Sequence, residues 1–291
     1  MEPDVSILSD ITCELGEGPS YDPATGTLWW FDIVGRRLLE HPFPGGPTRV
    51  HALPVMASAI AFTRDGRQIV ATERGVERRD AATGRLELLA PIEADDPATR
   101  SNDARVHQSG AFWIGTMGKK AEARAGAIYH YRAGKVTRLF GEISIPNSIC
   151  FSPAGDVAYF ADTGRNMLHR VAVDPATGLP AGEPALFLDQ RRQPGGIDGS
   201  VCDAEGVIWN ARWGAGRLDA YAPDGRLLRS IALPARQTSC PAFVGRTAER
   251  IAVTSALENM SPAERAADPD GGKTFLVDLP VRGRFEPHVT P

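Results

Sequence analysis

Short apolar stretches alternate along the chain with turns rich in Asp, Pro and Gly, and this alternation repeats with a fixed internal spacing. Each repeat starts with a polar residue, continues through four mostly small or apolar residues and reaches a turn glycine. In four repeats the glycine follows the polar residue by eight positions, and in the first by nine because the turn Asp22–Gly26 is one residue longer. The sixth repeat ends in a degenerate turn at 245–247. The polar residues that open the six repeats are Glu17, Ser58, Asn102, Asn147, Asp198 and Ser239.

A second strand-like stretch follows each of the first five turns. These stretches are rich in aromatic and β-branched residues, which favour strands, and they span 27–31, 68–72, 111–115, 157–161 and 207–211. A further hairpin then completes the repeat. The turn glycines recur every 40 to 51 residues. This period holds about four short strands and is typical of one blade of a β-propeller.

The pattern therefore predicts an all-β fold, a six-bladed β-propeller with four antiparallel strands per blade, in a single domain over 1–291. An isolated blade cannot bury both of its faces, so the blades must stack and the ring must close. The segment Val5–Ile11 precedes the first repeat, and we expect it to supply the outer strand of the last blade beside Lys273–Leu279. Helical periodicity is expected only at 261–267. A β-sandwich or a β-helix is the rival architecture and fits this period less well.

The composition and charge of the chain exclude several classes of binding partner. A net charge of −4 without any block of like charge gives no extended positive field for nucleic acid or an anionic membrane. No apolar run has the length of a membrane-spanning helix, and the start of the chain, Met-Glu-Pro-Asp, does not resemble a signal peptide. We therefore expect a cytoplasmic protein, a monomer or weak homo-oligomer, with a small-molecule partner. The four cysteines lack CxxC spacing and are expected to be reduced core residues, with a disulfide or a catalytic thiol as the alternatives.

The first strand of each propeller blade lines the central channel, so ring closure would bring the six polar residues together at the channel mouth. All six carry oxygen and none is a cation. Two carboxylates held close together repel unless a cation or a proton lies between them, and hard divalent cations bind carboxylate, amide and water oxygens. Glu17, Asn147 and Asp198 are thus the candidate ligands of a metal with positions open for water and substrate. The alternative is that the six side chains hydrate a water-filled channel or cap strands.

Other motifs do not compete with this interpretation. The chain has no HExxH zinc motif, no GxSxG nucleophile elbow and no GxGxxG after a strand. The six histidines are dispersed. His107 falls in a turn, where we expect it to face solvent.

The chain resembles the gluconolactonase family, which includes regucalcin and bacterial sugar lactonases, from about Cys13 to Leu279. Each matching motif is short, but all occur in the family's order. The motifs are Leu15–Pro19, Arg100–Asp103, Gly115–Met117, Pro146–Ser148 and Gly196–Gly199.

The resemblance implies a six-bladed propeller with one divalent metal ion, Ca²⁺, Mn²⁺, Mg²⁺, Zn²⁺ or Fe²⁺, held by Glu17, Asn147 and Asp198. It also implies that Arg100 and Asn102 contact the sugar lactone. Animal members carry a glutamate three residues after the Gly-Thr-Met motif, whereas this chain has Lys120. We expect Lys120 to contact the substrate as well, and therefore to alter which substrate groups are favoured. The loop around it, 119–125, is a candidate lid.

The function expected on this basis is metal-dependent hydrolysis of an aldonolactone, such as glucono-, xylono-, arabino- or galactonolactone, to the aldonic acid. Asp198 is the expected general base, because a carboxylate beside the metal can reach the attacking water. Two alternatives stay open. One is a related propeller hydrolase acting on another lactone or a phosphotriester, and the other is a non-catalytic, calcium-binding propeller.

Overall fold

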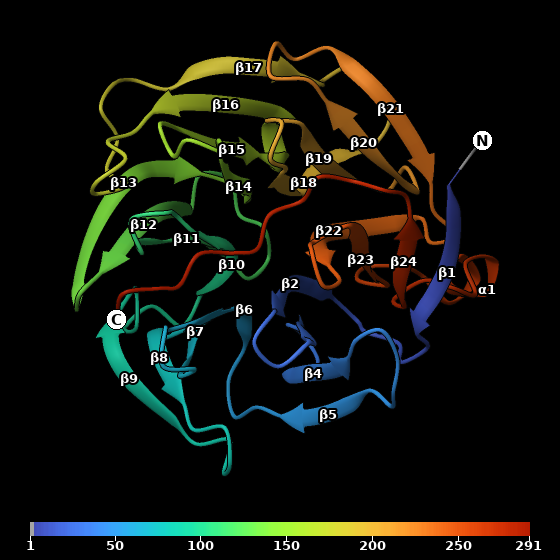
Figure 1. Ribbon diagram of the computed structural model, residues 1–291, viewed down its shortest axis with the longest axis horizontal. Helices are drawn as coiled ribbons and strands as arrows, with labels where there is room; N and C mark the ends of the chain where they lie inside the picture. Colours follow the sequence, from blue (N-terminus) through green and yellow to red (C-terminus); the bar gives the residue numbers. More distant parts are fainter. Residues whose placement is uncertain (1–2) are drawn as a thin grey trace.

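The computed structural model describes residues 3–291 and arranges the strands as six four-stranded antiparallel sheets in a ring around a central axis (Figure 1). The first three sheets are blade 1 with β2 (Gly16–Asp22), β3 (Thr27–Asp32), β4 (Arg37–Pro42) and β5 (Arg49–Ala52); blade 2 with β6 (Ala57–Phe62), β7 (Gln68–Thr72), β8 (Gly75–Arg79) and β9 (Leu86–Pro91); and blade 3 with β10 (Thr99–Val106), β11 (Phe112–Gly118), β12 (Gly126–Arg132) and β13 (Lys135–Ile143).

The other three sheets complete the ring. They are blade 4 with β14 (Pro146–Phe151), β15 (Val157–Asp162), β16 (Met167–Ala172) and β17 (Ala185–Asp189); blade 5 with β18 (Gly196–Cys202), β19 (Ile208–Trp213), β20 (Arg217–Tyr221) and β21 (Leu227–Ala232); and blade 6 with β22 (Gln237–Val244), β23 (Arg250–Ala256), β24 (Thr274–Asp278) and β1 (Asp4–Ser9). The predicted six-bladed propeller is confirmed.

The ring is closed by the strand that precedes the first repeat, as the sequence predicted. β1 pairs antiparallel with β24, with Val5 opposite Val277. Blade 6 therefore combines the two ends of the chain. The predicted helix is also present as α1 (Pro262–Ala267), which begins with a capping box between Ser261 and Glu264. Across residues 3–291, the helices are too short or too polar to cross a bilayer.

Hydrophobic clusters fill the spaces between neighbouring blades. One cluster joins blades 2 and 3 through residues such as Ile69 and Phe112, and another joins blades 3 and 4 around the fully buried Trp113. This is the stacking that ring closure requires. The four cysteines are free and buried, as expected from their spacing.

A β-bulge interrupts the inner strand of every blade at the position of the polar residue that opens the repeat. Each register shift lies between the inner strand and its neighbour. The shifts fall between Glu17 and Ser20, Ala57 and Ala59, Ser101 and Ala104, Asn147 and Cys150, Ile197 and Ser200, and Thr238 and Pro241. A bulge bends its strand and redirects a side chain. The repeated polar residue therefore marks a repeated backbone irregularity beside the channel.

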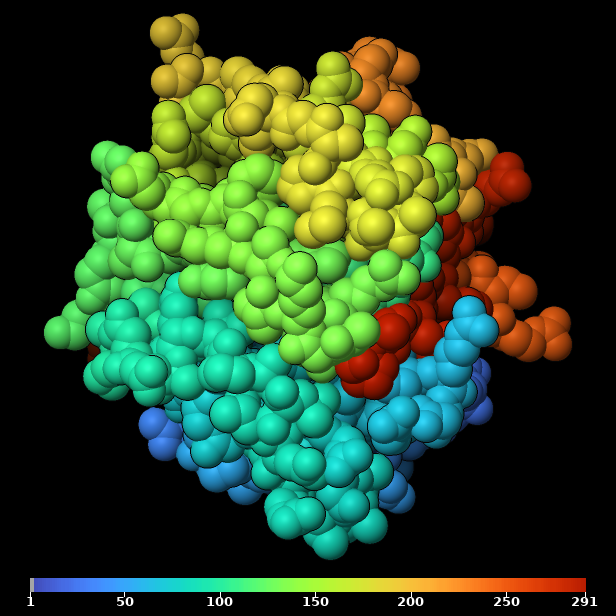
Figure 2. Space-filling model, turned by 90° about the vertical axis from the view of Figure 1, so that its left-hand side faces the viewer, coloured from blue at the N-terminus to red at the C-terminus, as the bar shows by residue number. Residues whose placement is uncertain are grey.

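The C-terminal segment after β24 crosses the ring on the face where the inner strands end (Figure 1). Its backbone forms hydrogen bonds with several blades. The Arg282 carbonyl accepts a hydrogen bond from the Ala204 amide at 2.7 Å. The Val289 and Thr290 amides donate to the carbonyl oxygens of Phe62 and Gly110, each at 2.9 Å. In Figure 2 the end of this segment, in red, lies on the surface beside the cyan and green residues of blades 2 and 3. We call residues 281–291 the C-terminal strap.

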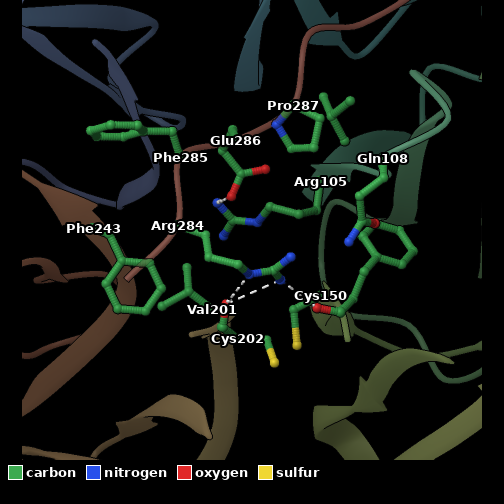
Figure 3. Close-up of a pocket in the computed structure, with 12 residues that line it drawn as sticks. Arg105, Gln108, Cys150, Val201, Cys202, Phe243, Arg284, Phe285, Glu286 and Pro287 are labelled. Atoms are coloured by element: carbon green, nitrogen blue, oxygen red, sulfur yellow. Dashed lines mark hydrogen bonds and ion pairs between the residues drawn. The ribbon is translucent and has the colours of Figure 1, made fainter. Parts of the chain in front are cut away.

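Arg105 of blade 3 and Arg284 of the strap line a small cavity of about 30 Å³ between the strap and the blades (Figure 3). The Arg105 guanidinium pairs with Glu286 of the strap at 3.2 Å, and Arg284 donates to the carbonyl oxygens of Phe151 at 2.8 Å and Cys202 at 3.2 Å. Cys150 also lines this cavity. The strap thus closes the channel at one end.

The prediction that His107 faces solvent is wrong. Its side chain is fully buried, because the turn that carries it packs against the first turn of blade 4. The ring bonds the Gly155 carbonyl and the Ser109 hydroxyl, both at 2.8 Å, and packs edge-on against Phe151. His107 therefore connects two blades.

Candidate active site

The open end of the channel holds a cavity of about 430 Å³. Every residue assigned to the site from the sequence lines it. These residues are Glu17, Arg100, Asn102, Lys120, Asn147 and Asp198. They come from blades 1, 3, 4 and 5, so circular closure brings together side chains separated by long stretches of sequence.

Two of the six repeated polar residues do not line this cavity. Ser58 donates to the Ser101 hydroxyl at 2.8 Å, and Ser239 donates to the Gly16 carbonyl; both side chains are buried. Their hydroxyls satisfy contacts between neighbouring blades. The expectation that all six side chains meet at the channel mouth therefore holds for four of them, because serine is too short to extend past the backbone that it bonds.

Glu17 and Asp198 are buried carboxylates that repel each other. Burial and the nearby Asp103 raise the pKa of Glu17 to about 8, against the opposing effects of the Gly18 amide and Arg100. Burial and Glu17 raise the pKa of Asp198 well above its usual range. The Gly18 amide donates to Glu17 at 2.9 Å. A pair of this kind is stabilised by a proton or a cation placed between the carboxylates.

The Asn147 amide is held in one orientation by two neighbours. Its Nδ2 donates to the Thr163 hydroxyl at 2.8 Å, and its Oδ1 accepts from Asn102 Nδ2 at 2.9 Å. The Asn102 oxygen in turn accepts from Arg100 Nη1 at 2.7 Å. This chain of bonds fixes the oxygen of Asn147 on the side of the cavity where Asn102 lies.

These donors fit a hard divalent cation. Two carboxylates and one amide oxygen are the ligand types that Ca²⁺, Mg²⁺ and Mn²⁺ take, and the cavity leaves room for water or a substrate oxygen as further ligands. Within residues 3–291 no group of three or more His, Cys, Asp or Glu side chains could hold a metal. A metal bound here would therefore depend on the amide of Asn147 as its third protein ligand.

Positive charge reaches the cavity from blade 3. Arg100 is buried, and burial lowers its pKa while Glu258, Glu17 and Asp198 oppose that effect. Lys119 pairs with Glu73 at 2.5 Å. Lys120 is exposed at the rim and forms no ion pair with any described residue from 3 to 291.

Sequence reasoning missed several residues of the cavity wall. Thr163 follows β15 and supports Asn147, and Trp213 ends β19. Glu258 and Asn259 follow β23 and line the cavity from blade 6. These residues lie at the end of the second strand of a blade or directly after it, on the same open face as the start of the first strand. A search for polar residues at the ends of second strands would have found Glu258 and Thr163.

Comparisons with known proteins show which family this propeller belongs to. Residues 15–257 match the model of the SMP-30/gluconolactonase/LRE-like region, so the chain belongs to that family. It is 53% identical over 280 residues to the "Putative sugar lactone lactonase" of Rhizobium meliloti (strain 1021), covering 96% of this chain and 95% of the relative. The L-arabinolactonase of Azospirillum brasilense is 32% identical, covering 94% and 91%.

A solved structure supports the same placement. The calcium-binding protein regucalcin from Agrobacterium tumefaciens strain C58 superposes with a TM-score of 0.97 at 51% identity, covering 100% of this chain and 98% of that one. Together the relatives support a lactone-hydrolysing enzyme, as the sequence predicted.

Proposed function

We propose that this protein hydrolyses a sugar lactone, an aldonolactone of the glucono-, xylono-, arabino- or galactono- type, to the aldonic acid with the help of one divalent metal ion. The observation that carries the proposal is the pair of buried, mutually repelling carboxylates, Glu17 and Asp198, beside the fixed amide of Asn147 in an open cavity. The lactonase names of the relatives add the reaction type. The similarity to regucalcin, a calcium-binding protein, supports the involvement of a metal.

Glu17, Asn147 and Asp198 would hold the ion. When bound, a divalent cation supplies Lewis-acid polarisation of the lactone carbonyl. Asp198 accepts the proton of the attacking water through its carboxylate. The water oxygen bonds to the carbonyl carbon, the bond from that carbon to the ring oxygen breaks, and the ring oxygen takes up a proton to become the hydroxyl of the aldonic acid.

Arg100, Asn102 and Lys120 orient the substrate. The guanidinium of Arg100 is held against Asn102 by the bond at 2.7 Å, so its position is fixed before a ligand binds. Lys120 lies at the exposed rim, where an ammonium group can reach the part of a ligand farthest from the channel. The 6-deoxy-6-sulfogluconolactonase of Pseudomonas putida, 31% identical, acts by its name on a lactone with an anionic group.

The test is a pH-indicator assay on metal-stripped protein reloaded with Ca²⁺, Mn²⁺, Mg²⁺, Zn²⁺ or Fe²⁺. Glucono-, xylono-, arabino- and galactonolactone are the substrates, and an organophosphate triester tests the rival hydrolase. We expect turnover of at least one lactone that disappears on metal removal and in Asp198→Ala, whose thermal unfolding stays cooperative. Full activity of that variant would refute the role of Asp198. Calcium binding without turnover of any lactone would favour a non-catalytic calcium-binding propeller.

A further inference from the structure

Among residues 3–291, Glu258 is the one carboxylate on the cavity wall that lies outside the proposed metal-binding triad. It follows β23 in blade 6, whereas Arg100 and Lys120 reach the cavity from blade 3 on the other side of the ring. It therefore brings negative charge to the wall opposite the cations.

The loop that carries Glu258 is held firmly by its backbone. The Leu257 amide donates to the Glu14 carbonyl at 3.0 Å, and the Glu258 carbonyl accepts from the side chain of Gln237 at 3.1 Å. Leu257 and Met260 are buried on either side. Because its flanking residues are anchored, the Glu258 side chain projects from a fixed backbone rather than from a flexible loop.

The carboxylate of Glu258 lacks a partner in the part of the chain that the structure describes. No hydrogen bond or ion pair within residues 3–291 involves its side-chain oxygens, although the residue is partly buried. Burial raises its pKa, Arg100 opposes that rise, and Glu14 adds to it. Its oxygens are not among the fully buried, unsatisfied side-chain atoms of residues 3–291, so a ligand in the cavity can reach the carboxylate and donate a hydrogen bond to it.

The chemistry of the wall points to hydroxyl donors. Arg100 and Lys120 can only donate hydrogen bonds, whereas an ionised carboxylate can only accept them. The ring of an aldonolactone carries several hydroxyl groups on the carbons between the carbonyl and the ring oxygen, and O–H···O⁻ bonds are among the stronger hydrogen bonds. We infer that Glu258 determines specificity by accepting hydrogen bonds from the hydroxyl groups of the lactone ring. This inference rests on the proposed function and deepens it.

The experiment compares a hydroxylated with an unsubstituted ring. Steady-state rates on glucono-δ-lactone and δ-valerolactone are measured for calcium-loaded wild type, Glu258→Ala and Glu258→Gln, with spontaneous hydrolysis subtracted. Glu183→Ala, which removes an exposed carboxylate between β16 and β17, is the matched control. We expect kcat/KM on gluconolactone to fall about tenfold or more in Glu258→Ala, mainly through KM, since a hydrogen bond to a charged group is lost. The rate on δ-valerolactone should stay within about twofold in the same variant.

Glu258→Gln keeps an acceptor oxygen and should give an intermediate loss, which also covers the case in which the alanine variant fails to fold. Equal losses on both lactones, or no loss on either, would overturn the inference.

A binding measurement separates this inference from the proposed function. Calorimetry with 1,5-anhydroglucitol, a cyclic polyol without a carbonyl, tests hydroxyl recognition alone. If wild type turns over no lactone, the proposed function fails, and binding decides the role of Glu258. Weaker polyol binding in Glu258→Ala than in wild type and Glu183→Ala supports the inference, and equal binding by all three overturns it.

Discussion

Glu17 and Asp198 place two buried carboxylates in one cavity, and a chain optimised for stability alone would avoid that arrangement. Asn147, by contrast, is fully supported, since each end of its amide has a partner. At the scale of single residues, the site therefore has a fixed geometry, but without a metal ion its two buried carboxylates are not balanced by positive charge. This imbalance makes the stability of the metal-free protein sensitive to pH and to charge removal.

Glu17 should make the metal-free protein lose stability as pH rises from about 5 to about 8, against the opposite effect of the four histidines whose pKa burial lowers. Burial raises the pKa of Glu17 to about 8 in the folded state, whereas a glutamate in the unfolded chain titrates near about 4.3. Between these values the folded state binds more protons, so raising the pH favours unfolding. Melting curves at several pH values would measure the effect. Glu17→Gln should flatten the dependence, and an equally steep curve for that variant would contradict the assignment.

Asp198→Asn should have opposite consequences with and without metal. Without metal, it removes a carboxyl group whose ionisation burial and Glu17 disfavour, so the melting temperature should stay equal to or exceed that of wild type. With saturating Ca²⁺, wild type gains stability by ligand binding whereas the variant gains little. Lactone hydrolysis should fall about 10²–10⁴-fold. A calcium-induced shift in melting temperature as large as that of wild type would rule out Asp198 as a ligand.

At the scale of elements, the inner strands position the site through their bulges. The residue after Glu17 is Gly18, whose backbone has φ of +55° and packs against the Ser58 carbonyl of the next blade. A side chain here would be strained by the backbone conformation and would also collide with that backbone. The bulge of blade 1 therefore needs glycine for two independent reasons.

Gly18→Ala should destabilise the fold by about 2–4 kcal/mol and reduce metal affinity, because relief of the collision moves Glu17. The matched control is Gly134→Ala in the β12–β13 hairpin. Gly134 also has positive φ, at +75°, but an added methyl group there meets no atom within 4 Å. The control should lose only about 1 kcal/mol and keep its activity. Chemical denaturation and calcium titration measure both quantities, and equal effects in the two variants would show that the contact with Ser58 is unimportant.

Much of the element arrangement could be predicted because spacing is a local property. The repeat of a polar residue and a turn glycine located the inner strands, and the unpaired Val5–Ile11 segment indicated how the ring closes. The burial of His107 could not be predicted, since it depends on the neighbouring turn at Gly155. The inward-facing Glu258 was missed for a similar reason: its loop follows β23, outside the repeat register, and is placed by Gln237 and Glu14.

At the scale of the whole molecule, the two ends of the channel differ. The open end holds the polar cavity, and the other end is closed by the strap, whose composition gave no sign of its course. The Arg105 guanidinium pairs with Glu286 of the strap at 3.2 Å. Burial raises the pKa of the nearby Asp103 to about 6, although the charge of Arg105 opposes the rise. One end of the chain thus contributes to the charge balance beneath the proposed metal site.

The strap should therefore stabilise the ring mainly through its buried contact. Glu286→Gln leaves the guanidinium of Arg105, which is only 6% exposed, without its partner at 3.2 Å. The expected cost is about 1–3 kcal/mol, below that of a fully buried pair because Glu286 is 26% exposed. Glu205→Gln is the matched control, since it breaks the exposed pair with Arg282 of the same strap and should cost less than about 0.5 kcal/mol. Denaturant unfolding of both variants measures the difference. Equal free energies of unfolding would mean that the buried pair of Arg105 and Glu286 holds the strap no better than the exposed pair of Arg282 and Glu205, because the two substitutions differ mainly in the burial of the pair that they break.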